Sequence, residues 1–228
     1  MAKVVYGPIV SDARKKIGGI VATKGHAGNF MRKKVSPIQP RTQAQMVVRS
    51  QFSAHSKNWA LLTAPVIAAF NALAKSIPKK DRFGASVTQT GLQLYQGLSR
   101  NIDTVEGTPL TAAPASLVAS TPGDLTVVAT HNHGTFTVVP THYPLTGEAA
   151  AVYAGPPIGL GKSYVGKTAR FIKHFPYAGS PTAFDIKDAY RDKYGLFTTG
   201  KQIEVQVKNI NITTGAAGQA SAKLQTTV

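Results

Sequence analysis

The sequence predicts an α+β protein in which a basic β-hairpin and helices come first and an all-β sandwich follows. Three observations lead to this prediction. Charge divides near residue 107, because residues 1–106 carry 16 Lys and Arg against 4 Asp and Glu, whereas residues 107–228 carry 10 against 6. Apolar residues in the first part take helical spacing from about residue 42. In the second part they alternate with a period of two, which is typical of strands.

The first predicted element is a β-hairpin over residues 17–35. Two apolar runs, Ile17–Val21 and Phe30–Val35, flank the turn-rich segment Gly25–Asn29. The pair Gly18–Gly19 would weaken an ordinary strand. We therefore expect a bulge there, or the close approach of another backbone.

Three helices are predicted next. After the extended connector Pro37–Pro40, Thr42 is expected to cap the first helix in a capping box with Gln45. The second helix begins at Thr63 with Pro65 in its first turn, and the third is capped by Thr90. The predicted inward residues are Ala44, Val47, Val48, Phe52, His55 and Trp59 in the first helix, Val66, Ile67, Phe70, Leu73 and Ala74 in the second, and Leu92, Tyr95 and Leu98 in the third. Phe52, Trp59 and Phe70 are assigned to the core.

A linker over residues 107–116 is predicted to join a module of residues 1–106 to a sandwich of residues 117–228. Pro109 and Pro114 make it semi-rigid. About seven short strands with turns between them fit a β-sandwich of this size. These strands are expected around residues 125–129, 136–140, 151–153, 164–172, 190–194, 203–212 and 224.

Composition limits the classes of partner and of site. The net charge of +16 and the pI near 10.1 indicate an anionic partner: a nucleic acid, an acidic protein surface or an anionic membrane. The chain has no cysteine, so disulfides and thiolate metal sites are excluded. The N-terminus lacks the apolar region of a secretory signal, and no apolar stretch is long enough for a membrane span. We expect a soluble protein.

The strongest functional signal is a cluster of cations around the predicted hairpin. A two-stranded ribbon can enter a groove of duplex DNA, where Lys and Arg neutralise phosphates. Only Phe30 is available for base stacking, so phosphate contact is expected rather than sequence reading. Docking onto an acidic protein surface is an equal alternative. The candidate binding residues are Arg14, Lys15, Lys16, Lys24, Arg32, Lys33 and Lys34, with Arg41 and Arg49 in support.

Catalytic, cofactor and metal sites are not predicted. His131, His133 and His142 lack the spacing of a ligand framework, and we read the first two as a polar hairpin tip. The stretch Gly155–Ser163 ends in Gly-Lys-Ser but has five residues between its flanking glycines, where a phosphate-binding loop has four. Asp185, Asp188 and Asp192 are interpreted as one solvated helical face. No nucleophile arrangement occurs, so an enzyme is the least favoured class.

Several short motifs carry a resemblance. They are Lys16–Lys24, Arg32–Val35, Pro37–Thr42, Ala44, Gln45, Arg49, Phe52, Trp59, Leu62, Thr63, Asp81–Gly84 and Thr90–Tyr95. This pattern resembles small phage and prophage-associated proteins in which an immunoglobulin or fibronectin-III-like sandwich follows a basic module. The resemblance covers most of residues 1–100 and implies a structural role with no catalytic residues.

The leading hypothesis is a non-enzymatic virion structural protein, either capsid-associated, a minor capsid protein or a decoration subunit. It would be made in the host cytoplasm and located in the virion. Its expected partners are other virion proteins and copies of itself in an oligomer or lattice, with packaged DNA as a further candidate for the basic module. No membrane partner and no cofactor are expected. The alternative hypothesis is a cytoplasmic DNA-binding or nucleoid-associated protein.

Overall fold

The chain is a mixed α+β protein, as predicted. The computed structural model describes residues 2–7, 13–25, 28–35, 38–81, 83–130, 134–161, 168–177, 183–196 and 199–227. Contacts divide the chain into two compact units, residues 1–96 and 97–228. We call them the N-terminal unit and the C-terminal unit, and describe each by itself. The predicted linker at residues 107–116 stays a prediction. The boundary between the two units lies ten residues before it, between residues 96 and 97 and inside a helix.

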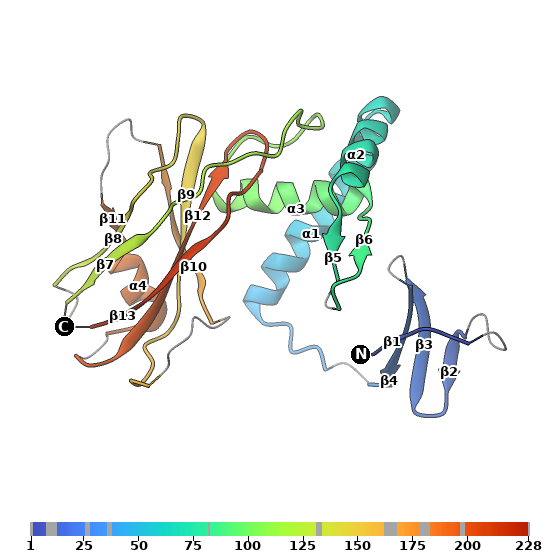
Figure 1. Cartoon of the computed structure of the whole chain (residues 1–228), viewed down its shortest axis with the longest axis horizontal. Coiled ribbons are helices and arrows are strands. Elements are labelled where there is room, and N and C mark those ends of the chain that lie inside the picture. Colours follow the sequence, from blue (N-terminus) through green and yellow to red (C-terminus); the bar gives the residue numbers. More distant parts are fainter. Residues whose placement is uncertain are drawn as a thin grey trace. The chain divides into compact units, whose positions relative to one another are not determined.

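The N-terminal unit begins with a four-stranded antiparallel sheet, which we call the basic sheet (Figure 1). Its strand order is β1-β4-β3-β2. The predicted hairpin is confirmed as the pair β3–β4, in which Lys24 lies opposite Asn29. Residues 26–27 of the predicted turn lie outside the described residues. The strands are β1 (Ala2–Val4), β2 (Lys15–Ile17), β3 (Ile20–Gly25) and β4 (Gly28–Lys33).

The expected bulge at Gly18–Gly19 is wrong, because these residues form the loop of a tight hairpin between β2 and β3. Ile17 pairs with Ile20, so the loop has two residues. Gly18 has a φ of +59°, the left-handed conformation that such loops require. A Cβ built on either glycine meets no atom of the described residues within 4 Å, so the expected close approach of another backbone is not found among them.

Helices α1 (Gln43–Leu61) and α2 (Ala64–Ser76) follow, then the two-residue strands β5 (Lys79–Lys80) and β6 (Ser86–Val87), then α3 (Gly91–Thr104). Thr42 caps α1 as predicted, with Oγ1 accepting the Gln45 N–H at 3.4 Å. The capping box is incomplete, because Gln45 Oε1 has no partner among the described residues. At α3 the box is complete: Thr90 Oγ1 accepts the Gln93 N–H at 3.3 Å, and Gln93 Oε1 accepts the Thr90 N–H at 3.0 Å.

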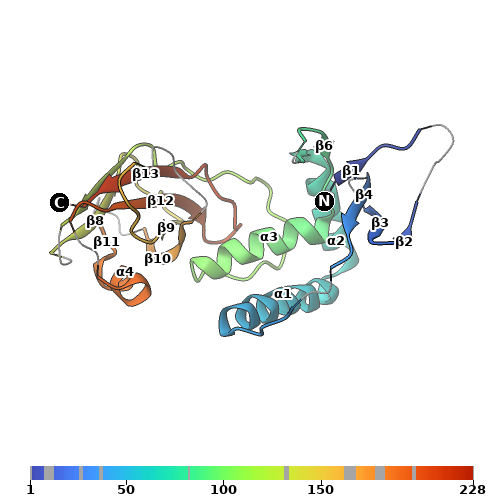
Figure 2. The same ribbon diagram turned by 90° about the horizontal axis from the view of Figure 1, so that it is seen from below.

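Three aromatic rings, one from each of the helices α1, α2 and α3 drawn in Figure 2, pack together. Phe70 of α2 is 0% exposed and lies 5.7 Å from Trp59 of α1 and 5.4 Å from Tyr95 of α3, between ring centroids. Trp59 and Tyr95 are 5.5 Å apart. Edge-on pairs of this kind contribute about 0.5–1.5 kcal/mol each beyond their buried area. The core assignment of Phe70 is confirmed, and Trp59 is half-buried beside it.

The core assignment of Phe52 is wrong. Its side chain is 59% exposed, and α1 has no fully buried residue. Phe52 lies two turns before Trp59 on the same side of the helix, beyond the reach of the ring cluster. Val47 and Val48 are exposed as well. The apolar stripe predicted along α1 is therefore covered only near its C-terminal end.

The C-terminal unit contains two antiparallel sheets, with strand orders β11-β8-β7 and β10-β9-β12-β13. Residues that alternate along the strands point between the sheets and form the core, including Val127, Phe136, Val152 and Val205. The strands are β7 (Leu125–Ala129), β8 (Phe136–Pro140), β9 (Glu148–Ala154), β10 (Arg170–Pro176), β11 (Phe184–Asp185), β12 (Gln202–Asn211) and β13 (Ser221–Thr226). Residues 162–167 of the predicted strand 164–172 lie outside the described residues.

The strand predicted at residues 190–194 is wrong, because these residues belong to helix α4 (Lys187–Tyr194). Tyr190 and Tyr194 are four residues apart and so lie on one helix face. Their hydroxyls donate to the carbonyls of Gly155 and Ala154, each at 3.0 Å. Gly195, with a φ of +76°, ends the helix.

The second half of α3 belongs to the C-terminal unit by contacts. Asn101 Nδ2 donates to the carbonyl of Gly215 at 2.8 Å, in the turn after β12. A Cβ on Gly215 would lie 2.4 Å from the Leu98 carbonyl oxygen, so only glycine allows this approach. Its φ of +68° imposes the same requirement.

We predict that Tyr190→Phe lowers the free energy of unfolding of the C-terminal unit by about 1–2 kcal/mol. Burial raises the pKa of Tyr190, so its hydroxyl stays a donor at neutral pH, and the variant leaves the Gly155 carbonyl without it. Urea unfolding of the full chain measures the change. Tyr177→Phe, at an exposed position, is the control and is expected to change stability by less than about 0.5 kcal/mol. Equal losses in the two variants would contradict the prediction.

Candidate anion-binding surface

The N-terminal unit carries a strong local excess of positive charge. Between Asp12 and Asp81 the sequence contains 13 Lys and Arg and no Asp or Glu. Most of these cations therefore have no acidic residue close to them along the sequence. Such a surface attracts anions over distances of about 10 Å at ordinary ionic strength.

The basic sheet brings most of the predicted cations together but divides them between its two faces. Residues paired across an antiparallel sheet share a face. Lys16 and Arg32 both pair with Val21 and so lie on one face. Lys15 pairs with Ala22, and Lys33 pairs with Ile20, on the opposite face.

Five of these cations are exposed and have no carboxylate partner among the described residues: Lys15, Lys16, Arg32, Lys33 and Lys34. Arg14 and Lys24 are exposed as well. Arg41 and Arg49 lie outside the sheet. Arg41 is in the segment before α1 and has a left-handed φ of +49°, and Arg49 is on α1. The structure therefore does not place these two on the basic sheet with the other candidates.

The predicted two-stranded ribbon is wrong in its width, because β1 and β2 flank the hairpin β3–β4. Three strand spacings of about 4.8 Å make the backbone about 14 Å wide. The major groove of DNA is about 12 Å wide and admits two strands or one helix. A sheet of this width can lie against an anionic surface but does not fit into the groove with its strands side by side.

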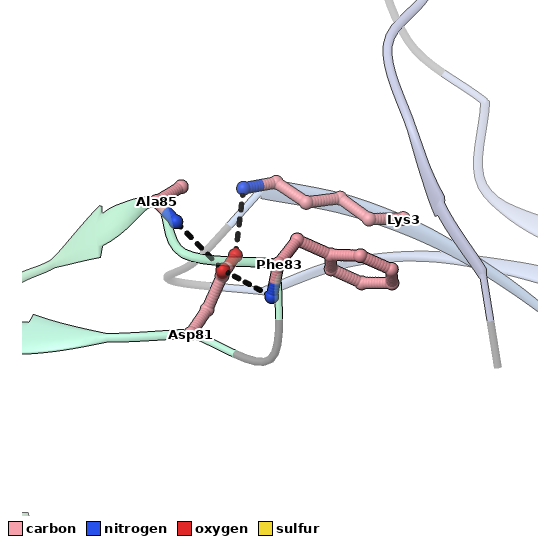
Figure 3. Close-up of polar contacts among 4 residues, drawn as sticks. All are labelled: Lys3, Asp81, Phe83 and Ala85. Atoms are coloured by element: carbon pink, nitrogen blue, oxygen red, sulfur yellow. Dashed lines mark hydrogen bonds and ion pairs between the residues drawn. The ribbon is translucent and has the colours of Figure 1, made fainter.

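An ion pair joins the basic sheet to the turn between β5 and β6 (Figure 3). Lys3 Nζ donates to Asp81 Oδ2 at 3.0 Å. Asp81 Oδ1 accepts the backbone N–H of Phe83 at 2.8 Å and of Ala85 at 2.9 Å. The Lys3 ammonium, and to a lesser extent these two amides, hold the pKa of Asp81 below its ordinary value. Sequence reasoning missed this pair, because its partners are 78 residues apart.

A shallow cavity of about 410 Å³ lies beside this ion pair. Phe30 of the sheet lines it together with Lys79, Lys80 and Val87 of the β5–β6 hairpin. Gln89, only 7% exposed, also lines it, and its amide has no hydrogen-bond partner among the described residues. The strands β5 and β6 have two residues each, too few for a period to appear in the sequence. Lys79 and Lys80 therefore add two cations that the sequence interpretation did not assign.

Buried carboxylates of the C-terminal unit serve its own backbone and side chains. Glu148 accepts from the N–H of Ser120 at 2.8 Å and of Leu145 at 3.0 Å. Glu204, 1% exposed, accepts from Thr168 at 2.8 Å and from Gln206 at 2.5 Å. Both carboxylates are thus engaged in holding strands and loops.

Candidate metal ligands do not gather in the described parts of the chain, where no three His, Asp or Glu could hold one ion. Asp188 and Asp192 of α4 both lie near Arg191, at 3.3 and 3.9 Å between charged atoms. The predicted solvated helical face is confirmed for these two residues and is wrong for Asp185, which lies in β11, before the helix begins. His131 and His133, and the Gly-Lys-Ser end of Gly155–Ser163, lie outside the described residues.

Within the described ranges, no single helix is long and apolar enough to cross a membrane. The bent pair α1 and α2, with 119° between the helices, meets the requirements of length and composition only when taken together.

Comparison of the chain with family models, with curated proteins and with solved structures gives no match.

We predict that Lys3→Ala raises the pKa at which Asp81 titrates. In the native chain the carboxylate has a lowered pKa, so the contact stabilises the turn above pH 3.8 and is lost as the pH falls through the lowered value. The amide chemical shifts of Phe83 and Ala85, followed by NMR from pH 7 to pH 2, report the titration. Lys79→Ala removes a cation that is not bonded to Asp81 and is the control. An unchanged midpoint in Lys3→Ala would contradict the assignment.

Proposed function

We propose that this chain is a non-enzymatic structural protein of a bacteriophage particle, held in place by its basic N-terminal unit. The observation that carries the proposal is the basic sheet, which presents five exposed cations without a carboxylate partner in the described chain. A surface of this kind attracts an anionic partner. We place that partner in the virion as an acidic face of another structural protein, with the chain made in the host cytoplasm.

An acidic protein face suits the basic sheet better than packaged DNA does. Ile17 and Ile20 are exposed on the face that carries Lys15 and Lys33. A phosphate backbone offers no apolar surface to cover such side chains. A protein surface can bury them, and each Å² of buried apolar area then contributes about 25 cal/mol to the free energy of binding. Phe30 is half-buried beside the cavity, which makes it a poor platform for stacked bases.

The C-terminal unit fits the same role as a stable spacer or outward-facing domain. Its three-stranded and four-stranded antiparallel sheets share one apolar core. This arrangement supports our assignment of the unit as an immunoglobulin or fibronectin-III-like sandwich. Domains of this class serve as extracellular and particle-surface modules in many unrelated proteins. The uses found above for Glu148 and Glu204 favour a structural role over a catalytic one.

We predict that Lys33→Glu combined with Lys34→Glu lowers the number of particle-bound copies at least about tenfold, because reversed charges meet an acidic face at a cost of several kcal/mol. Both side chains are exposed, so the chain is expected to stay folded. Quantitative mass spectrometry of nuclease-treated particles, purified on density gradients, gives the copy number. The matched control is Lys201→Glu with Lys223→Glu, which makes the same charge change at exposed positions of the C-terminal unit.

Two outcomes would overturn the proposal. Unchanged incorporation of the Lys33 and Lys34 variant would remove the basic sheet as the anchor. Loss of the native chain from the dense fractions after nuclease treatment would favour the alternative of a DNA-binding protein. In that case the affinity for duplex DNA would fall steeply with salt, by about 0.9 in log K per log unit of salt for each phosphate neutralised.

A further inference from the structure

Among the described residues, those that cover helix α1 lie mainly at its C-terminal end, while Gln45 near its start is half-buried. In its C-terminal half, Trp59 packs in the ring cluster, and Ser56 Oγ accepts from Gln96 Nε2 at 3.0 Å. Phe52 lies one turn before Ser56, and Val48 one turn before Phe52, on the same face. Both are exposed. The face that is packed at one end of the helix thus continues toward the other end with Val48 and Phe52 exposed.

Further apolar side chains lie on other sides of the same half of α1. Met46 and Val47 are each at least half exposed, and neither shares the face of Val48 and Phe52. A helix that is apolar on several sides is normally enclosed by protein. A helix that rests on a membrane surface instead has one apolar face and one charged face. The distribution on α1 therefore favours a groove over a lipid surface.

The positive charge of α1 indicates that the rim of such a groove carries acidic residues. Arg49 and Lys57 are exposed, and the helix contains no Asp or Glu. A second copy of this chain would bring the same cations to the contact, and like charges placed together cost several kcal/mol. A nucleic acid would satisfy the cations but not the apolar side chains. Only a different protein with carboxylates around an apolar groove satisfies both.

We propose that the N-terminal half of α1 inserts into an apolar groove on a second protein, and that Asp and Glu around this groove pair with Arg49 in that half and with Lys57 in the half that follows. Helix-in-groove recognition of this kind uses anchors spaced by three, four and seven residues. Val48 and Phe52 have this spacing. The inference names the kind of partner for the proposed structural role and, in that respect, rests on it.

Photo-crosslinking in the cells that produce the protein tests the inference. The full-length chain carries Phe52→p-benzoylphenylalanine in one variant and Leu145→p-benzoylphenylalanine in the control, at a residue of the C-terminal unit that is 62% exposed. We expect the Phe52 variant to form an adduct with a different protein, at an apolar segment flanked by Asp or Glu. The Leu145 variant is expected to give at most about a tenth of that adduct.

Charge reversal distinguishes pairing with an acidic rim from non-specific hydrophobic binding by the helix. In the Phe52 crosslinking chain, Arg49→Glu with Lys57→Glu is expected to lower the adduct at least about tenfold. Arg49→Lys with Lys57→Arg keeps the charge and is expected to retain it. Emission from Trp59, the single tryptophan, reports whether α1 remains packed in each variant. If the yield of the adduct is unchanged by the charge reversal, the inference of an acidic rim is wrong.

The remaining outcomes also decide the matter. Adducts with a second copy, with the C-terminal unit of the same chain, with lipid or with nucleic acid would each overturn the inference, and so would the absence of any adduct. Particle-bound and free fractions are analysed separately. If the expected adduct occurs only in the free fraction, the groove contact is supported and the virion role is contradicted. If particles contain the chain but the Phe52 variant forms no adduct in them, the virion role is supported and the groove contact is contradicted.

Discussion

The N-terminal unit is governed by a shortage of carboxylates. No Asp or Glu occurs between Asp12 and Asp81, and five exposed cations of the basic sheet and its edge have no carboxylate partner among the described residues. Asp81 connects two parts of the unit, because its two carboxylate oxygens accept hydrogen bonds from Lys3 of β1 and from two backbone amides of the β5–β6 turn. Self-repulsion of the remaining cations works against compactness. The unit therefore gains stability whenever an anionic partner occupies the sheet.

The two units differ in how their cores are built. In the C-terminal unit, residues from both sheets and from α4 form one continuous buried cluster. Only five apolar residues of the N-terminal unit are buried among those described: Ala22, Phe70, Ala74, Leu94 and Tyr95. The thin core leaves the ring cluster and the backbone ladders of the sheet to hold the N-terminal unit. A partner that covered the exposed apolar side chains of this unit would therefore add to its stability.

Sequence reasoning succeeded where the information is local. The cap of α3 by Thr90 and the alternation in β7 and β8 are predicted from local signals. The return bond from Gln93 is not predicted, and the capping box expected at Thr42 and Gln45 is incomplete. Sequence reasoning failed where the burial of a residue depends on segments that are distant in the sequence. Periodicity places Phe52 on the face of Trp59, but it carries no information on how far the covering cluster extends. The segment 190–194 is too short to separate a helical from an alternating pattern.

The two proposed contacts of the N-terminal unit have complementary physical roles. Exposed cations on the basic sheet act over a Debye length and mainly raise the association rate and set orientation. Apolar side chains such as Val48 and Phe52 act only on contact, and their burial slows dissociation. A chain that relied on charge alone would leave its site as salt rises. One that relied on α1 alone would bind any apolar surface. Since both features lie in one unit with almost no carboxylates, the two proposed contacts together would select a partner that is acidic and grooved at once.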